Sequence, residues 1–446
     1  MSSKIIQIRT APVSEDDAAT KVRACMPDRG LMDWPRQIRT LQDVIAWDLC
    51  SGCGACYYAC PTGVVSLVNV ASVGIHPSFG PEGCGSCVQC LSICPGFRVE
   101  GELAADSSSK ERDHVEEFGS YLEIWEGFAT DPEIRFKASS GGVLSALSLY
   151  CLEREGMEFV LHAGMDESKP WTNTTVQSRN RDDILKRTGS RYAPASPCDG
   201  LKAIEESPRP CVFIGKPCDA EAVSMLRQQR PELDQKLGIV LTFFCAGTPN
   251  SQGTIDLLDS LNVIPNTISS VRYRGEGWPG GFKVQFKDRA DEKFIPYEAS
   301  WGKLTRYRNL RCHLCPDGLG QVADISCGDA WHQFNGNSDI GRSIIIVRTR
   351  RGQEILRRAW SEKYVELQVI GPEAVRSAQP NMLERNREIF GRLLARRLFL
   401  IPSPQFRGFF LLRNWLQLSL GRKFRTVMGT IGRIALRGLW RQVSDN

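Results

Sequence analysis

Two short stretches of the sequence carry four cysteines each at the same spacing. The first is CSGCGACYYACP at residues 50–61, and the second is CGSCVQCLSICP at residues 84–95. Both follow the pattern CxxCxxCxxxCP. In two-cluster ferredoxins, the first three cysteines of such a run hold one 4Fe-4S cluster and the fourth reaches the neighbouring cluster. The repeat therefore predicts two 4Fe-4S clusters.

The predicted ligands form two sets, and each set takes its fourth cysteine from the other motif. One cluster is assigned to Cys50, Cys53, Cys56 and Cys94, and the other to Cys84, Cys87, Cys90 and Cys60. A zinc ribbon is the alternative, and its tetrahedral site needs two CxxC pairs separated by a longer spacer. Four cysteines in each motif, followed by a proline, fit that pattern poorly. We therefore favour iron–sulfur clusters over zinc.

The size and composition of the chain argue against a disulfide framework. With 446 residues, of which 42% are hydrophobic, the chain can bury a large core without covalent staples. Its 17 cysteines are an odd number, so complete pairing would leave one thiol over. The start, MSSKIIQIRT, lacks the apolar stretch of a signal peptide, and we find no uncharged run long enough to span a bilayer. We expect a reduced, cytoplasmic compartment.

The elements that must position the cysteines fall into five regions. We predict a two-cluster bacterial ferredoxin fold at 41–100, a polar linker at 101–120, an α/β domain in two regions at 121–205 and 206–375, and a helical basic tail at 376–446. From about residue 121, short apolar strands alternate with helical stretches, which is typical of an α/β domain. The expected fold class is α/β, or α+β overall.

Four further cysteines lie where an α/β sheet gathers its ligands. Cys218 follows an expected strand at 211–214, Cys245 follows a second strand, and Cys312 and Cys315 form a CxxC pair in a loop. Ligands of open α/β sheets bind beyond the carboxyl ends of the strands, and four cysteines suffice for one more 4Fe-4S cluster. Packing residues, a redox pair or half of a zinc site are alternatives that the spacing leaves open. We expect the remaining cysteines to be packing residues, namely Cys25, Cys151, Cys198, Cys211 and Cys327.

A serine–glycine turn is predicted to open a helix in KASSGGVLSALSLYCLEREG, residues 137–156. Free amides at such a helix start, with glycines that allow close approach, suit a phosphate group. An ordinary serine cap without any ligand is the alternative.

Other nucleotide-binding and metal motifs are absent from the sequence. The stretch RYRGEGWPGG fits GxGxxG, but the strand-like GFKVQFKD follows it where a dinucleotide-binding turn would open a helix. We find no Walker A sequence and no HExxH motif. Nucleotide hydrolysis and zinc proteolysis are therefore not expected.

Several ordered motifs together resemble those of one known family. The order SSGGVLSAL, GSRYAP, FIGKPCDAEA, FFCAGTP, RGEGWPGGF, RCHLCPD and ADISCGDAWH resembles the coenzyme F420-reducing hydrogenase beta subunit family over about residues 121–350. With the double ferredoxin module in front, the architecture is similar to the dehydrogenases of reduced coenzyme F420 and to flavin-dependent relatives that reduce chlorophyll derivatives. The resemblance implies an α/β flavin domain with bound FAD, a nearby 4Fe-4S cluster and a two-electron partner such as a deazaflavin.

The resemblance also implies roles for individual residues, although it assigns no catalytic residue. It suggests that Ser140, Gly141 and Gly142 hold the FAD phosphates, that Ser190, Arg191 and Tyr192 lie near the flavin or its partner, and that Asp329 and Trp331 line the flavin site. It promotes Cys218, Cys245, Cys312 and Cys315 to cluster ligands. Two positions depart from the family pattern, because Ala246 stands where a histidine is often found and Asp219 where glutamine is frequent. Either change puts coenzyme F420 itself in doubt as the second substrate.

The expected function is that of an iron–sulfur flavoprotein oxidoreductase. A hydride donor delivers two electrons together and a cluster accepts one, and a flavin can hold the intermediate state. The expected partners are a hydride-carrying small molecule and a one-electron donor or acceptor protein. The alternative is an electron-transfer subunit that relays electrons within a larger complex and has no substrate of its own.

The end of the chain is basic. From Gln405 to Asn446 there are eight Lys or Arg residues and one acidic residue, Asp445. On a helical projection of residues 422–441, one side is apolar and the opposite side carries the arginines. The apolar side comprises Phe424, Val427, Met428, Ile431, Ile434, Ala435 and Leu439, and the basic side Arg422, Arg433, Arg437 and Arg441. Such a helix suits peripheral contact with an anionic membrane at its inner face, or docking on its own domain or a partner subunit, and both readings stay open. Nucleic acid is not expected, because no aromatic platform accompanies the charges.

Overall fold

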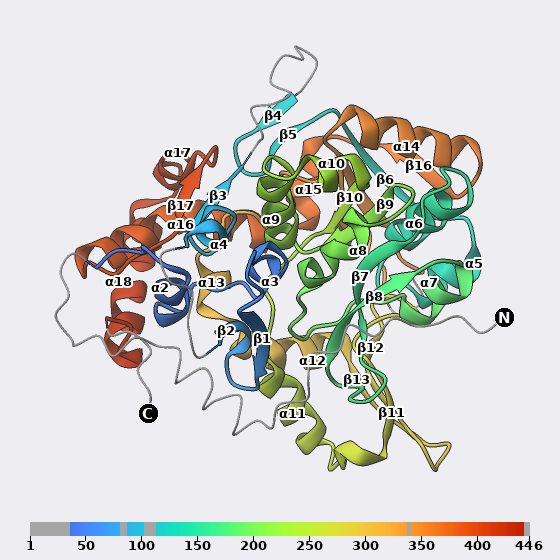
Figure 1. The fold of residues 1–446 in the computed structure, drawn as a ribbon, viewed down its shortest axis with the longest axis horizontal. Coiled ribbons are helices and arrows are strands. Elements are labelled where there is room, and N and C mark those ends of the chain that lie inside the picture. The colour runs from blue at the N-terminus through green and yellow to red at the C-terminus, as the bar shows by residue number, and fades with distance from the viewer. Residues whose placement is uncertain (1–35, 81–86, 102–112, 337–339, 441–446) are drawn as a thin grey trace.

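The computed structural model describes residues 36–80, 87–101, 113–336 and 340–440. Its centre is an eight-stranded sheet with the strand order β16-β6-β15-β14-β10-β9-β7-β8 (Figure 1). The strands are β6 (Glu123–Ala129), β7 (Val160–Met165), β8 (Asn173–Ser178), β9 (Cys211–Gly215), β10 (Leu237–Phe243), β14 (Ile325–Asp329), β15 (Ser343–Val347) and β16 (Val365–Val369). The four central strands β7, β9, β10 and β14 run parallel, whereas their outer neighbours pair antiparallel. The α/β class expected from the sequence is confirmed.

Apolar side chains of the central strands feed two separate cores on the two faces of the sheet. Along β9, Val212 belongs to one core and Phe213 to the other, as the alternation of side chains in a strand requires. The first core is covered by α6 (Val143–Glu153) and α14 (Arg350–Ser361), and the second by α8 (Leu201–Glu205), α9 (Pro217–Arg227) and α10 (Pro231–Lys236). Burial on both faces explains why the central strands are almost continuously apolar.

The ferredoxin module packs on the second core. It consists of α2 (Leu41–Ala46), α3 (Ala55–Ala59), β1 (Val65–Val70), β2 (Gly74–Phe79), α4 (Gln89–Ser92) and β3 (Arg98–Glu100). Strands β1 and β2 form an antiparallel hairpin. Cys53, Tyr58 and Ile93 of this module share the core that contains Phe213 and Val223 of the α/β domain. The module is therefore part of one continuous hydrophobic interior.

Part of the predicted linker is structured. Strands β4 (Asp113–Val115) and β5 (Gly119–Tyr121) form an antiparallel hairpin, and Phe118 between them is completely buried. The rest of that linker, residues 102–112, lies outside the described residues. Phe118 packs with Leu319 and Ile346, so the hairpin belongs to the α/β core.

A small second sheet forms one side of the cavity described below. It has the order β11-β12-β13, with β11 (Ile268–Arg272), β12 (Gly281–Phe286) and β13 (Glu292–Pro296). It packs against α11 (Ser251–Ser260) and α12 (Tyr297–Leu304). The stretch GFKVQFKD thus forms a strand, as its alternation predicts. The remaining helices before the tail are α5 (Pro132–Lys137), α7 (Arg181–Arg187) and α13 (Leu310–His313).

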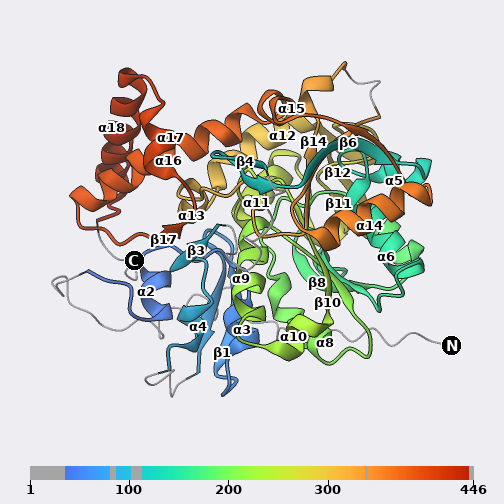
Figure 2. The ribbon, with the colours of Figure 1, turned by 90° about the horizontal axis from the view of Figure 1, so that it is seen from above.

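The C-terminal region returns to the ferredoxin module. It contains α15 (Pro372–Ala378), α16 (Pro380–Leu398), β17 (Gln405–Arg407), α17 (Leu411–Leu416) and α18 (Leu420–Arg437). Strand β17 pairs in parallel with β3, with Phe406 opposite Val99. Figures 1 and 2 both place α16, α17 and α18 beside the ferredoxin module at one end of the molecule. Within the described residues, no helix has both the length and the apolar character needed to cross a bilayer.

Helix α18 docks on α16 by a face that coincides only in part with the apolar side of the projection, because Ile434 belongs to that side and Thr426 and Thr430 do not. Its buried side chains Thr426, Thr430 and Ile434 recur at every fourth residue, and Arg422 forms a two-bond ion pair with Glu384 of α16 at 2.8 and 2.6 Å. The reading of a helix docked on its own domain is thus confirmed for this face. Phe424 and Met428, assigned to the apolar side, are exposed instead. Arg441 lies outside the described residues.

Candidate cofactor sites

The first set of ferredoxin cysteines converges in the interior. Burial and the proximity of Cys53 and Cys94 raise the pKa of the Cys50 thiol, and burial with Cys53, Cys50 and Cys94 nearby raises the pKa of Cys56. Burial, with Cys53 as a neighbour, also raises the pKa of Cys94 to about 12. Four thiolates this close and this buried repel one another unless cations lie between them, and the irons of a cluster supply that charge. This donor set fits a 4Fe-4S cluster.

Glycines let the cysteine loop fold around this position. Gly52 and Gly54 have φ of 70° and 85°, in the left-handed region that favours glycine. A Cβ atom on Gly54 would lie 2.9 Å from the carbonyl oxygen of Ser196, so the loop presses directly on the α/β domain.

The second ferredoxin set is described only in part. Cys84 lies outside the described residues. Of the other three, Cys90 is buried with its Sγ 3.6 Å from the carbonyl oxygen of Cys56, Cys60 is half-buried, and Cys87 is exposed. Cys90 is thus adjacent to the first set, and Cys87 lies at the surface of the module.

The third set comes together from three separate elements. Cys218 lies in the first turn of α9, Cys245 follows β10, and Cys312 and Cys315 lie in and after α13. Burial raises the pKa of Cys218, with Cys245 and Cys315 as contributing neighbours, and burial with Cys312 nearby raises the pKa of Cys245 to about 12. The four cysteines predicted from scattered motifs therefore lie close to one another.

Positive charge and backbone donors surround this third set. Arg385 of α16 donates to the carbonyl oxygens of Cys245 and Ala246 at 2.9 and 2.8 Å, and the amide of Thr248 lies 3.4 Å from the Sγ of Cys312. Among the described residues, no three His, Cys, Asp or Glu side chains converge closely enough to hold a single metal ion. A four-iron cluster is larger than one ion, and its ligands stand further apart.

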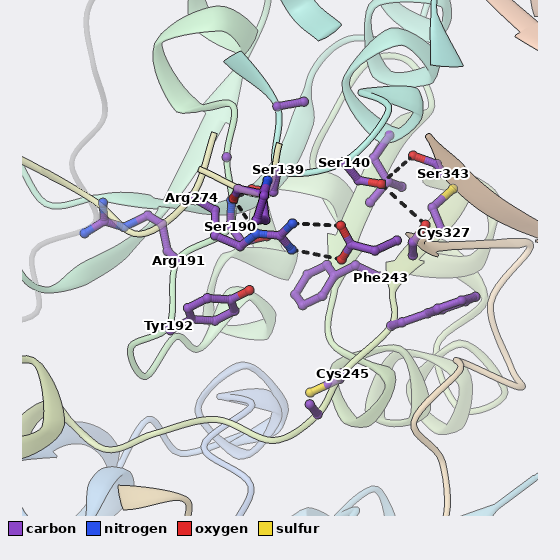
Figure 3. A pocket seen from close by; sticks show the side chains of 18 of the residues that line it. Ser139, Ser140, Ser190, Arg191, Tyr192, Phe243, Cys245, Arg274, Cys327 and Ser343 are labelled. Carbon is purple, nitrogen blue, oxygen red and sulfur yellow. Dashed lines mark hydrogen bonds and ion pairs between the residues drawn. The ribbon is translucent and has the colours of Figure 1, made fainter. Parts of the chain in front are cut away.

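Beside the third set lies a cavity of about 1190 Å³ at the carboxyl ends of β9, β10 and β14. Of the residues that the resemblance points to, Ser140, Gly142, Ser190, Arg191, Tyr192, Asp329 and Trp331 line it. Gly141 does not. Cys245 also lines the cavity, and Figure 3 shows it below Tyr192 and Phe243. The cavity thus connects the predicted flavin residues with the third cysteine set.

The serine–glycine turn is held rigidly by its own hydrogen bonds. Ser140 donates from Oγ to the carbonyl oxygen of Arg342 at 2.8 Å, and the Gly141 amide donates to Ser343 Oγ at 3.0 Å. A Cβ atom on Gly141 would lie 2.6 Å from the carbonyl oxygen of Gly127, so the glycine is required for packing against β6. The amide of Gly141 is therefore already bonded within the protein.

The turn leaves the start of α6 open. The residue before the helix is Gly142, with φ of 79°, and no side chain caps the first turn. The serine cap considered from the sequence is therefore wrong. Because the first amides of a helix have no partners within it, they are available to an acceptor in the cavity, which the first turn lines.

Arg191 contributes to the cavity wall with its guanidinium turned away. Its Nη1 donates to the carbonyl of Val271 at 2.6 Å, and its Nη2 donates to the carbonyl oxygens of Pro170 and Thr172 at 2.8 and 3.1 Å. Figure 3 shows this side chain directed away from Arg274. The guanidinium of Arg191 therefore bonds to backbone carbonyl oxygens of the protein. The role that the resemblance implies for Arg191 stays a prediction.

An aromatic wall with a charged pair at its base faces the cavity. Trp331 stacks on Trp278 with ring centres 5.0 Å apart and on Tyr297 at 5.6 Å. Arg274 donates two hydrogen bonds of 2.8 Å to Asp329, and Trp278 Nε1 donates to the same carboxylate at 2.8 Å. Asp329 keeps the pKa of the buried Arg274 above its ordinary value against the effect of burial. The pair fixes the positions of the stacked rings.

Sequence reasoning missed several cavity residues. Arg274 and Trp278 lie in the RGEGWPGG stretch, whose order in the chain marks the family but gives the two residues no role. Phe243 likewise begins the family motif FFCAGTP without a role being given to it, whereas Tyr297 and Trp301 had no local signal, because only the folded chain brings them to the cavity. Asp219, which stands where glutamine is frequent in the family, has a structural role. Its carboxylate accepts hydrogen bonds of 2.8 Å from both the backbone amide and the Nζ of Lys216.

The expected packing cysteines are found in the interior. Cys151, Cys198 and Cys211 are completely buried, and Cys327 is buried but also lines the cavity. Cys25 lies outside the described residues.

The chain matches three family models. Residues 124–203 match the N-terminal region of the coenzyme F420 hydrogenase/dehydrogenase beta subunit, residues 209–373 match its C-terminal region, and residues 49–96 match a 4Fe-4S dicluster domain. The two beta-subunit models together cover more than half of the chain.

Individual relatives agree with these matches. One of the subunits of the F(420)H(2) dehydrogenase from Methanosarcina mazei is 23% identical over 368 residues, which are 79% of this chain and 90% of that protein. The beta subunit of the coenzyme F420 hydrogenase from Methanosarcina barkeri is 27% identical over 60% of this chain and 91% of its own. A solved structure of the F420-reducing [NiFe] hydrogenase complex from Methanosarcina barkeri contains a chain of like fold, with a TM-score of 0.52, 24% identity, and coverage of 66% of this chain and 98% of that one. The protein therefore belongs to the coenzyme F420 hydrogenase/dehydrogenase beta subunit family and carries a 4Fe-4S dicluster domain in front of the family's two regions.

Proposed function

We propose that this oxidoreductase passes electrons between a hydride-carrying small molecule of the deazaflavin type and a one-electron partner protein, through FAD and three 4Fe-4S clusters. The observation that carries the proposal is the single cavity that reaches from the open start of α6 to Cys245. Its relatives are named as subunits of F420-linked hydrogenases and dehydrogenases. An F420-linked electron-transfer role follows from the family, and the proposal adds the flavin, the third cluster and the substrate class.

The cavity has the chemistry that FAD requires. The amides of Val143 and Leu144 in the open first turn of α6 would hold the diphosphate, and Gly142 allows its close approach. The stacked rings of Trp331, Trp278 and Tyr297 would shield the flavin ring from water. When bound, FAD supplies a group that takes up an electron pair and releases electrons singly.

The size of the cavity supports a second occupant. A drug-sized ligand site usually measures about 300 to 1,000 Å³, and this cavity is larger. We propose that the hydride-carrying molecule shares it with FAD, so that the two rings meet along the aromatic wall. The relay alternative, a subunit without its own substrate, has no need of such a cavity.

The proposed clusters follow the cysteine sets. Cys50, Cys53, Cys56 and Cys94 would hold the first, Cys60, Cys84, Cys87 and Cys90 the second, and Cys218, Cys245, Cys312 and Cys315 the third. Arg385 and Lys216 beside the third set would stabilise its negative charge. The exposed Cys87 marks the face at which the one-electron partner would dock.

Cofactor content tests the proposal directly. Protein purified without oxygen should contain about one FAD and about twelve iron atoms per chain if three four-iron clusters form. About eight irons with no flavin would support the relay, and zinc without visible absorption would overturn both. Reduction of the bound flavin by a panel of NADH, NADPH, reduced F420 and ferredoxin identifies the electron donor.

We also propose that the C-terminal helices contact an anionic membrane surface in the cytoplasm. On α17 and α18, large apolar side chains face solvent, and Leu420, Phe424 and Met428 recur at every fourth residue. These exposed positions, here called the C-terminal apolar residues, are Leu412, Leu416, Leu420, Phe424, Met428 and Leu436.

The charge around these residues suits acidic headgroups. Arg425 is exposed beside Phe424, while the acidic Glu384 and Glu116 nearby are neutralised by Arg422 and Arg413. Apolar side chains flanked by cations are the pattern of a helix lying in a membrane interface. A protein partner that covers the same residues is the alternative outcome.

A further inference from the structure

The guanidinium of Arg311 is buried where the third cysteine set meets the ferredoxin module. Arg311 lies in α13, directly before Cys312, and its Nη2 donates to the carbonyl oxygen of Pro95 at 2.9 Å. Pro95 directly follows Cys94. One side chain therefore connects a segment that carries proposed ligands of the third cluster with a segment that carries a proposed ligand of the first.

The charge of Arg311 has no directly bonded counter-ion in the part of the chain that the structure describes. The residue is 3% exposed, its Nε and Nη1 have no hydrogen-bond partner there, and it forms no ion pair with a described Asp or Glu. The ring of Phe406, with its centre 5.5 Å from the guanidinium carbon, adds a cation–π contact but no negative charge. Since arginine stays protonated in proteins, a charge is buried here without its partner.

Two buried acids near the third set do not bond to this guanidinium. The carboxylate of Asp317 accepts from the backbone amides of residues 319–321 at 3.0, 2.7 and 2.9 Å. Burial raises the pKa of Glu221 well above its ordinary value, which favours its neutral form. A buried charge is costly unless it is compensated, so the surroundings of Arg311 suit negative charge that the described side chains do not supply.

We propose that Arg311 supplies a fixed positive charge that the first and the third cluster share, and that this charge raises the reduction potential of both. The inference rests on the proposed function in that the two cysteine sets hold clusters. Reduction adds one negative charge to a cluster, and a positive charge nearby stabilises the reduced form. Each cluster takes up one electron, Arg311 keeps its proton, and no proton moves.

A shared charge suits electron transfer between the two sites. An electron that passes from the third cluster to the first moves negative charge from one neighbour of Arg311 to the other, so the attraction of the guanidinium is kept throughout. The bond to Pro95 and the ring of Phe406 hold the guanidinium in place. Phe406 belongs to β17, so the C-terminal region closes over this charge.

Redox titrations of four variants test the assignment. Arg311→Met removes the charge and the bond to Pro95, Arg311→Gln removes the charge but keeps an amide that can donate to Pro95, and Arg311→Lys keeps the charge. Arg306→Met is the control, because it removes an exposed arginine of the neighbouring turn Thr305–Tyr307, whose charge is screened by solvent. Each protein, full-length and purified without oxygen, is titrated with dithionite and followed by electron paramagnetic resonance, and its iron is counted.

We expect Arg311→Met and Arg311→Gln to keep about twelve irons. The midpoint potentials of two clusters should become more negative by about 59 mV or more, which is a tenfold change in the one-electron equilibrium. Arg311→Lys should lie close to the parent, and Arg306→Met should match it. Unchanged potentials in either neutral variant overturn the inference, and so does a shift of only one cluster or a loss of iron. A parent protein with only about eight irons, or with none, would instead refute the proposed function.

Discussion

The guanidinium of Arg274 and the carboxylate of Asp329 face each other through two parallel hydrogen bonds of 2.8 Å. Arg274 also lies over the ring of Tyr297, with its guanidinium carbon 4.5 Å from the ring centre. The planar fork of arginine makes both contacts at once, which the single ammonium of lysine cannot do. This pair therefore fixes the positions of the stacked rings of Trp331, Trp278 and Tyr297, here called the aromatic wall.

The first prediction concerns Arg274→Lys. The variant keeps the charge but loses one of the two bonds and the stacking, so the aromatic wall should lose its fixed position. We expect bound flavin to fall at least tenfold, which corresponds to about 1.4 kcal/mol of binding free energy, while the iron content stays unchanged. Flavin released by denaturation is measured by fluorescence, with the exposed Arg289→Lys as control. Parental flavin content in Arg274→Lys would contradict the role of the pair.

The second prediction concerns the third cysteine set. Cys218→Ser should lower the iron content by about four atoms per chain, because one ligand of a single cluster is lost. The paramagnetic signals of the ferredoxin clusters should remain. Cys151→Ser is the control and should keep its iron, because Cys151 is completely buried in the core that contains none of the proposed ligands. An unchanged iron count in Cys218→Ser removes this residue from the ligands.

The third prediction concerns the C-terminal apolar residues. Replacing both Leu420 and Phe424 by Ser should weaken binding to vesicles of phosphatidylglycerol by tenfold or more, since each buried apolar side chain contributes about 1.5 to 3 kcal/mol. Ile264→Ser, at an exposed apolar position of the α/β domain, serves as control. Binding is measured by co-sedimentation, and it should weaken with salt. If the parent protein does not sediment with either anionic or neutral vesicles, the membrane proposal is wrong and a protein partner covers the C-terminal apolar residues.

The fourth prediction concerns acid stability. Burial lowers the pKa of His162 to about 4, and its Nε2 lies 2.8 Å from Ser178 Oγ. The unfolded chain takes up the proton near pH 6.5, before the folded one does, so this stabilisation is present above pH 6.5 and is lost as the pH falls toward 4. Between pH 7 and 5, His162 should account for a decrease of about 2 kcal/mol in the free energy of unfolding. Denaturant titrations should give a shallower pH dependence for His162→Gln, and equal slopes would refute this assignment.

The sequence predicts those parts of the site that depend on local spacing. Cys218 and Cys245 could be placed at strand ends because a strand, a turn and a helix can be recognised in a short window. The sequence also offered an open start for α6, and its alternative, a serine cap, is wrong because Gly142 precedes the helix and no side chain caps it.

Features that depend on tertiary contacts could not be predicted. Nothing near Arg311 in the chain indicates that it will meet Pro95, because 216 positions separate the two residues. The periodicity of α18 predicts a helix, yet α16 presents Glu384 to Arg422 and Gly391 to Thr426, so Thr426 and Thr430 are buried while Phe424 is left exposed. The partner of a helix decides which face is covered, and the helix's own sequence does not name that partner.

The pairing of β17 with β3 has a consequence for biosynthesis. The ferredoxin cysteines leave the ribosome first, but the edge of β3 at Val99 stays open until Phe406 has been made. More than three hundred residues must be translated between these two events. Strand β3 therefore lacks this partner until translation is nearly finished, and the fold around the ferredoxin module is complete only then.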